Sequence, residues 1–292
     1  MIKRLSLAIA AMAALLVPAA ASAQVIRQFT RKDLTIQVDP ALSYIFYRTQ
    51  AQAPMIFIRE PDAADRADWR KARDAALEKA RRKYRNELHT YESAMWTWNR
   101  TPSSARAGLV KPVAPVEPTE ENVVSPTMEM ITMTEGRISP AFFKAKPVFG
   151  FLIAVKPGTY SIYGSVLMTG NGFGGICLCM GTVKFDAKPG EIVDLGIFAT
   201  HGVAVGGPFP RMEPYGHPLP TELRPFDGPP PAPLQGLPVH PAVLRAAGKF
   251  PNYFGVTIDR IHPMQGVLSY RRDTIIDERT GQPLANQSGT AD

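Results

Sequence analysis

Apolar and polar residues alternate in short runs toward both ends of the chain, and this pattern predicts β-strands. Before residue 60 the runs are Leu34–Val38, Ser43–Arg48 and Met55–Arg59. Beyond residue 127 they return, separated by Pro-Gly turns. These later runs are Met128–Met133, Pro147–Val155, Lys156–Met168, Ile176–Phe185, Ile192–Phe198, Phe254–Ile261 and Gly266–Ile276. Short strands at this spacing predict a mainly β fold, an antiparallel β-sandwich.

A different pattern occupies residues 62–98, which contain no glycine or proline and are rich in Ala, Arg, Lys and Glu. Apolar residues recur there every three or four positions, so their side chains share one face of a helix. They are Trp69, Ala72, Ala76, Ala80, Tyr84, Leu88, Tyr91, Met95 and Trp98. Asp62 and Asp65 stand where the positive end of a helix favours acidic side chains. We therefore expect one long helix inserted into the sandwich.

Prolines divide the rest of the chain. Residues 100–126 show no periodicity, which predicts an irregular or extended linker. Residues 207–241 hold twelve prolines, which argues against a core strand and predicts a long surface loop. Pro241–Lys249 has Pro at its start and Gly near its end, as a helical turn would. We expect one domain over residues 24–277 and a disordered polar tail over 278–292.

The first residues have the pattern of a signal peptide. Lys3 and Arg4 precede an apolar run from Leu5 to Val17, and Ala21-Ser22-Ala23 has the small residues of a cleavage site. We predict that residues 1–23 are removed and that the mature chain is exported, to the periplasm if the host is Gram-negative. No later run of the sequence reaches the roughly 18 apolar residues of a membrane helix.

The charge of the chain narrows the class of its partners. Without Lys3 and Arg4, the formal net charge falls from +7 to +5, which is mildly basic and below the charge density of a nucleic-acid binder. The polar face of the predicted helix is basic, with Arg70, Arg73, Arg81, Arg82 and Arg85 as candidate interaction residues. This face is either an ordinary solvated surface, with the apolar stripe packed on the sandwich, or a contact for an anionic envelope surface or a partner helix.

Cys177 and Cys179 are the only cysteines of the chain. Residues two apart in a strand share a face, and their Cα atoms stand about 6.6 Å apart at ~3.3 Å rise per residue. A disulfide needs Cβ atoms about 3.8 Å apart, so a flat strand cannot bridge them, although a bulge could. Three interpretations remain: packing as small apolar residues in the core, a disulfide within or between chains, and a soft-metal site.

The metal interpretation draws on nearby methionines. Met128, Met130 and Met133 form M-x-M-x-x-M, and Met180 follows Cys179 directly. Thiolate and thioether ligands select Cu(I), which exported proteins meet. Cys177, Cys179, Met180, Met128 and Met130 are therefore the candidate ligands, although Met128 and Met130 also alternate as core residues of a strand would.

Motifs of enzymatic chemistry do not emerge. The run from Gly170 to Gly175 satisfies G-x-G-x-x-G, but a predicted strand follows it where a dinucleotide site needs a helix. The five histidines are scattered, without the local spacing of metal ligands. Nucleophile-elbow, zincin, Walker A and EF-hand patterns are not found in the sequence. We therefore expect a protein that is not an enzyme.

Residues 156–196 contain a recurrent pattern, a PG-x-Y strand followed by a PGE turn and a strand ending in an aliphatic-Gly pair. Its residues here are Pro157, Gly158, Tyr160, Pro189, Gly190, Glu191, Leu195 and Gly196. Over about fifty residues the chain thus resembles exported bacterial β-sandwich domains of unknown function. The resemblance implies a sandwich and an envelope location, and it carries over no catalytic residue.

The sequence thus favours a non-enzymatic, exported cell-envelope protein with a binding or structural role and an unknown ligand. The alternative is a periplasmic copper-binding or thiol redox protein that uses Cys177, Cys179 and the nearby methionines.

Overall fold

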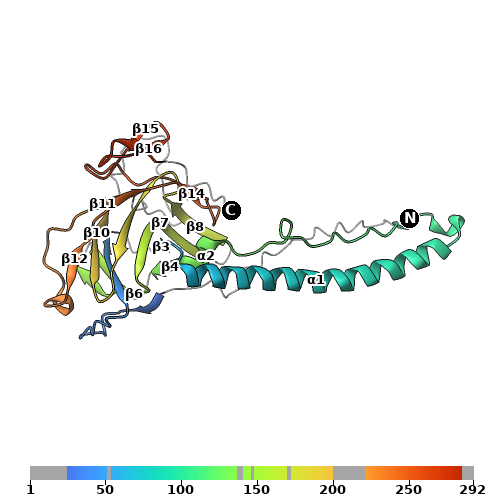
Figure 1. Ribbon diagram of the computed structural model, residues 1–292, viewed down its shortest axis with the longest axis horizontal. Helices are drawn as coiled ribbons and strands as arrows, with labels where there is room; N and C mark the ends of the chain where they lie inside the picture. The colour runs from blue at the N-terminus through green and yellow to red at the C-terminus, as the bar shows by residue number, and fades with distance from the viewer. Residues whose placement is uncertain are drawn as a thin grey trace, which may run out of the picture.

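The computed structural model describes residues 25–50, 54–136, 141–145, 148–169, 172–199 and 221–284. Within them the chain is mainly β with one long helix, α1 (Ala63–Arg100), as the sequence predicts. Figure 1 shows that α1 leaves the strands near its first turns and projects away from them. The predicted signal peptide and residues 207–220 of the predicted Pro-rich loop lie outside the described residues.

Two sheets, each of seven described strands, form the body of the molecule. In the first, which we call sheet A, the order is β1 (Val25–Gln28), β6 (Val148–Val155), β2 (Ser43–Thr49), β10 (Ile192–Ala199) and β11 (Glu222–Arg224), with β5 (Phe143–Ala145) beside β6 and β12 (Val239–Pro241) beside β10. In the second, sheet B, the order is β13 (Arg245–Ala247), β9 (Thr182–Ala187), β7 (Gly158–Thr169), β3 (Met55–Arg59) and β4 (Met133–Gly136), with β8 (Gly172–Cys177) beside β7 and β14 (Thr257–Ile258) beside β8.

The remaining described elements are short. A third sheet joins β15 (Leu268–Arg271), β16 (Thr274–Asp277) and β17 (Gln282–Pro283). Helix α2 (Met128–Thr132) packs against α1 and β3, and two 3₁₀ turns are η2 (Ser103–Arg106) and η3 (Ala232–Leu234).

The sheets are mixed, where the sequence predicts antiparallel ones. Strand β10 runs parallel to β2, with Ile192 beside Tyr44 and Asp194 beside Phe46, and parallel to β12 on its other side. Strand β14 likewise runs parallel to β8. Hairpin turns enforce antiparallel pairing only between strands that are close in sequence, and more than 140 residues separate β2 from β10.

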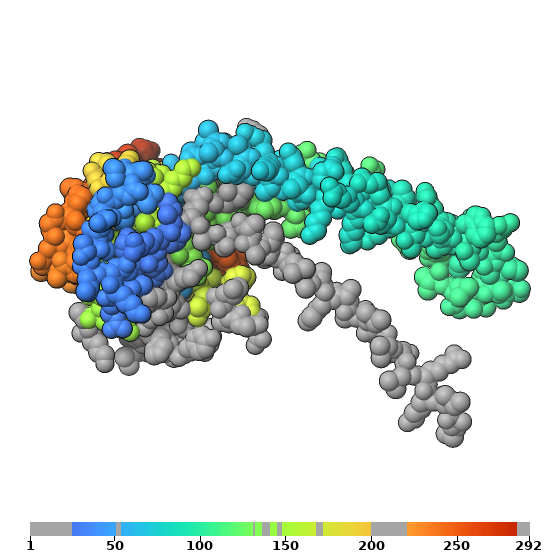
Figure 2. Space-filling model, turned by 90° about the horizontal axis from the view of Figure 1, so that it is seen from below, coloured from blue at the N-terminus to red at the C-terminus, as the bar shows by residue number. Residues whose placement is uncertain are grey.

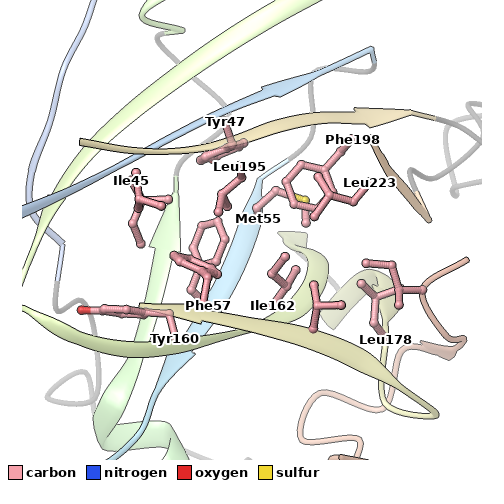
Figure 3. Close-up of a cluster of buried hydrophobic side chains, with 14 of the residues drawn as sticks. Ile45, Tyr47, Met55, Phe57, Tyr160, Ile162, Leu178, Leu195, Phe198 and Leu223 are labelled. Atoms are coloured by element: carbon pink, nitrogen blue, oxygen red, sulfur yellow. The ribbon is translucent and has the colours of Figure 1, made fainter. Parts of the chain in front are cut away.

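The sheets pack face to face in a sandwich-like arrangement around a shared core. Figure 3 shows Tyr47 and Leu195 of sheet A across from Phe57, Tyr160 and Ile162 of sheet B. All five side chains are buried in one cluster. The Tyr47 ring stands 5.5 Å from that of Phe57, edge to face, a favoured geometry for aromatic pairs.

Strands β2 and β3 are buried on both faces, because short segments cover the outer side of each sheet. Over sheet A lies a cluster that includes Phe29, Ile36, Phe142 and Leu234. Over sheet B, Val256 joins a second cluster, against which Phe250, Tyr253 and Phe254 pack. This double cover explains the continuous apolar and aromatic runs Tyr44–Tyr47 in β2 and Met55–Ile58 in β3.

Local chemistry changes several of the predicted elements. Residues 128–132 form helix α2 instead of a strand, because Thr127 caps its N-terminus and accepts a hydrogen bond from Met130 N at 3.3 Å. Gly266–Ile276 is a hairpin, β15 and β16, whose turn places Arg272 at a positive φ of 56°. Leu34–Val38 carries no strand in the structure.

The Pro-rich region and the chain beyond it are also more ordered than predicted. Strands β11 and β12 lie within 207–241, and both pair with β10 on the edge away from β2, β12 near its start and β11 near its end. Residues 241–249 are extended, with β13 in place of the expected helical turn. Only Thr257–Ile258 of the predicted strand Phe254–Ile261 is a strand, and β17 lies in the segment expected to be a disordered tail.

Candidate functional site

The first turn of α1 is fixed to sheet B by a buried ion pair. Asp62 and Asp65 form a capping box, in which each side chain accepts a hydrogen bond from the backbone N–H of the other. Arg59, at the end of β3, donates from Nη2 to both carboxylate oxygens of Asp65, at 2.7 and 2.6 Å. Both side chains are buried, so this pair sets where the helix leaves the sheet.

A second cation, Lys156, joins the ion pairs at the first turn of α1. Lys156 Nζ lies 2.6 Å from Asp62 Oδ2 and 3.6 Å from Asp65 Oδ1. The hydrogen bond from Lys156, together with that from the Asp65 N–H, holds the pKa of Asp62 below its usual value. Asp62 is thus ionised at neutral pH and stabilises the N-terminus of the helix.

The apolar stripe of α1 packs against the linker that follows the helix. Every residue of the stripe is half-buried. At one end, Trp69 Nε1 donates to Pro126 O at 2.9 Å, and at the other, Arg106 stands 5.2 Å from the ring of Trp98. Figure 1 shows residues 101–126, which we call the connector, running back along the helix toward α2. The helix and connector, residues 63–126, together form what we call the stalk.

Prolines make the contact side of the connector. Pro112, Pro115 and Pro118 are half-buried, whereas the other residues from 111 to 119 are exposed. A period of three is that of polyproline II, which has three residues per turn and no internal hydrogen bonds. The sequence predicts an irregular or extended linker here, and the P-x-x-P-x-x-P spacing is the signal that specifies the extended form.

The helix and the connector of the stalk span similar lengths. From Arg73 to Trp98 the helix rises about 38 Å, at 1.5 Å per residue. From Leu109 to Thr119 a polyproline II chain rises about 31 Å, at 3.1 Å per residue, and the turns at 106–108 and from 120 onward lie at its two ends. The side chain of Arg73 pairs with Glu120, as Arg106 pairs with Trp98, so each half of the hairpin spans the same distance.

The stalk carries apolar side chains that face solvent. Val110, Val113 and Val116 follow the same period of three and are 88%, 85% and 81% exposed. They form a row along the connector, offset from the prolines that meet the helix. Trp96 and Leu109 are also exposed, near the turn between helix and connector. Figure 2 shows this end of the stalk standing clear of the sheets.

The five arginines proposed as interaction residues all lie on the stalk. Arg73 pairs with Glu120, and Arg81 with Glu78 at 3.2 Å. Arg70, Arg82 and Arg85 are exposed, and no acidic group among the described residues pairs with them. The structure therefore separates the five into two that pair with a glutamate of the stalk and three that pair with no acidic group of the described residues.

Cys177 and Cys179 form a disulfide, so the first interpretation, two free cysteines packed in the core, is wrong. Their Cα atoms stand 5.1 Å apart instead of the 6.6 Å of a flat strand, because β8 ends at Cys177 and a turn follows, closed by Gly181 N donating to Leu178 O. Both cysteines are buried under the second covering cluster. Asp259 N donates to Cys177 O, and Phe250 N donates to Cys179 O.

The proposed copper ligands are only partly brought together. Met133 packs against the cluster that contains both cysteines, whereas Met128 and Met130 lie on α2, outside that cluster. Met180 follows Cys179 in the turn and is half-buried. A disulfide offers no thiolate, so the Cu(I) hypothesis now concerns the reduced protein.

No group of three His, Cys, Asp or Glu side chains in the described part of the chain is arranged to hold a metal ion. His201 and His217, which the sequence places in loops, lie outside the described residues. None of the described helices is apolar over a stretch long enough to cross a membrane. Comparison with protein-family models, curated proteins and solved structures gives no match to this chain.

Proposed function

We propose that this chain is a non-enzymatic, exported protein of the cell envelope that binds an anionic partner through the basic surface of its stalk. The observation that carries the proposal is the run from Lys79 to Arg85, which holds five cations and no acidic residue. Their side chains are exposed on a helix that stands away from the sheets.

This concentration of charge works against the stability of the helix. Lys79 and Lys83, and likewise Arg81 and Arg85, are four residues apart, where like charges cost a few tenths of a kcal/mol per pair. Glu78 and Glu87 offset part of this through their pairs with Arg81 and Lys83. Folding thus gives no reason for the surplus of positive charge, whereas binding to an anionic surface does.

The construction of the stalk leaves this surface available. The connector covers the apolar stripe, so α1 needs no further partner to bury it. Arg70, Arg82 and Arg85 can then meet a polyanion without disturbing the sheets. The same geometry suits a spacer role, since a helix of 38 residues reaches about 57 Å from its base.

Two observations support export. The first 23 residues have the sequence of a signal peptide. Disulfides form and persist in oxidising compartments, and the only two cysteines of the chain are joined.

The proposal is tested by co-sedimentation with vesicles of phosphatidylcholine alone or mixed with phosphatidylglycerol. We expect binding only to the anionic vesicles, and its loss at 1 M salt, where the Debye length falls to about 3 Å. At ~1 kcal/mol for each cation near an anionic surface, replacing Arg70, Arg82 and Arg85 by Gln should weaken binding by about 100-fold.

A matched control removes the same charge from the sheet region. Arg31, Lys32 and Arg271 are exposed there, and a variant with Gln at these positions should bind within about twofold of the parent. Equal weakening in the two variants would show that net charge alone drives association, and binding that high salt leaves unchanged would also refute the proposal.

A further inference from the structure

Arg48 is a buried arginine on the outer face of sheet A. It lies on β2, beside Gly150 of β6 and Ile197 of β10, and its side chain is 1% exposed. Phe46, two residues earlier, shares its face and belongs to the cluster that covers this sheet. A buried cation in these surroundings requires partners for its five N–H groups.

Only part of the guanidinium is satisfied. Nη1 donates to Asp194 Oδ1 at 2.7 Å. Nε and Nη2 are buried and have no hydrogen-bond partner among the described residues. The same Asp194 oxygen accepts from Gly196 N at 2.8 Å, which holds the carboxylate at Nη1 and away from the opposite edge.

Two aromatic rings cover the faces of the guanidinium. Its central carbon is 4.4 Å from the centre of the Phe46 ring and 4.1 Å from that of Phe226. The edge that Nε and Nη2 form is itself buried, so a ligand in the plane of the guanidinium reaches it only when the Phe226 ring moves aside. Phe226 is 38% exposed, so this ring is the wall that stands between the guanidinium and solvent.

The free edge has a defined chemical complement. Nε–H and one Nη2–H are parallel donors, and a carboxylate accepts both in one plane. Leaving these donors buried without acceptors costs free energy, which a bound carboxylate would recover. We propose that Arg48 is the anchor of a small-carboxylate site, with Asp194 holding the guanidinium and Phe226 covering it. This site is separate from the stalk and does not depend on its proposed function.

The test uses the full-length protein and sodium acetate as the probe, with sodium chloride at equal ionic strength as the reference. The Nε–H resonance of Arg48, followed by nitrogen NMR, should shift in a saturable manner with acetate. The melting temperature should rise in parallel, because a ligand that binds only the native state stabilises it. Absence of both effects would overturn the proposal, and so would saturation by sulfate with equal affinity, which would mark a site for oxyanions in general.

Two variants locate the effect. Arg48→Lys keeps the charge opposite Asp194 but lacks the planar edge, and it should lose at least tenfold in acetate affinity. Phe226→Ala leaves the Arg48–Asp194 pair intact and provides the test if Arg48→Lys does not fold. It removes one wall, so we expect acetate affinity to change at least threefold. Unchanged affinity in Phe226→Ala, or in a folded Arg48→Lys, would contradict the assignment.

Discussion

Arg59 Nη2 donates hydrogen bonds to both carboxylate oxygens of Asp65, at 2.7 and 2.6 Å, and neither side chain is exposed to solvent. This contact joins the last residue of β3 to the first turn of α1. It is the point at which the sandwich controls the direction of the stalk.

Asp65→Asn should therefore destabilise the protein strongly. Neutralising Asp65 leaves the buried Arg59 charge with the longer pair to Asp62 Oδ2, at 3.4 Å. Loss of a partner from a buried ion pair typically costs about 3–5 kcal/mol in the free energy of unfolding. Urea denaturation followed by circular dichroism measures it. The control is Glu78→Gln, which removes an exposed pair with Arg81 and should cost below about 1 kcal/mol. Similar losses in both variants would show that the buried pair has no special role.

Replacing Pro112, Pro115 and Pro118 by Ser should uncover the helix while leaving the sheets intact. Serine lacks the fixed φ that favours polyproline II, and the half-buried rings that face α1 would be lost. We expect faster amide hydrogen exchange in residues 80–98 and unchanged exchange in β2 and β7. The matched control replaces Val110, Val113 and Val116 by Ser, on the outward side of the same connector. If exchange rises equally in the valine control, the prolines do not protect the helix more than the outward-facing valines do, and the prediction is wrong.

The sequence was sufficient where the determining contacts are local. Helix α1 follows from a stripe repeated every three or four residues, and β2, β3 and β6 follow from apolar runs of strand length. The sequence was insufficient where the pairing of strands depends on contacts between distant segments. The parallel pairing of β2 with β10 depends on contacts across more than 140 residues, which no local pattern encodes.

The candidate sites divide in the same way. The basic residues of the stalk could be identified from the sequence, but which of them are paired depends on where the connector places Glu120. The disulfide was not the favoured outcome, since the end of β8 at Cys177 is set by the turn after it and by the pairing with β14. The sequence did not indicate a site at Arg48, because a single arginine in a strand is common. Its significance comes from the contacts with Phe226 and Asp194, which only the structure shows.

Cys177 and Cys179 should take up no alkylating agent in denaturant without reductant, because their sulfur atoms are joined in a disulfide. Mass spectrometry should show no added label and the mass of a monomer, since the bond lies within one chain. Substituting both by Ala should cost only about 1.6 kcal/mol, because so short a loop restricts the unfolded chain little. Two labelled thiols, or the mass of a dimer, would contradict the structure here. The reduced protein is then the form in which to titrate Cu(I), with a chromogenic chelator as competitor.

Tyr163 should contribute to a loss of stability at alkaline pH. Burial raises its pKa to about 12, above the ordinary value of about 10. The unfolded chain therefore loses this proton first, so the stabilisation is complete below pH 10 and declines as the pH rises toward 12. Tyr163→Phe should be less stable at pH 8, having lost the bond to Pro251 O and the one from Tyr253 N, yet fall less steeply between pH 8 and 11. Urea unfolding at each pH measures this slope.

The half-exposed Tyr91 on the stalk provides the control for that slope. The profile of Tyr91→Phe should follow that of the parent protein. If Tyr163→Phe also follows the parent, the alkaline loss arises elsewhere in the core.

The most direct test of the account removes the stalk. Trp69 and Pro126 lie side by side at its base, so residues 71–125 can be replaced by a short Gly-Ser turn without stretching the chain. Circular dichroism of the β signal and alkylation of the cysteines check that the sheets persist. We predict that the shortened protein no longer sediments with vesicles containing phosphatidylglycerol, whereas the parent does. Equal sedimentation of the two would place the binding surface on the sandwich and contradict the role of the stalk.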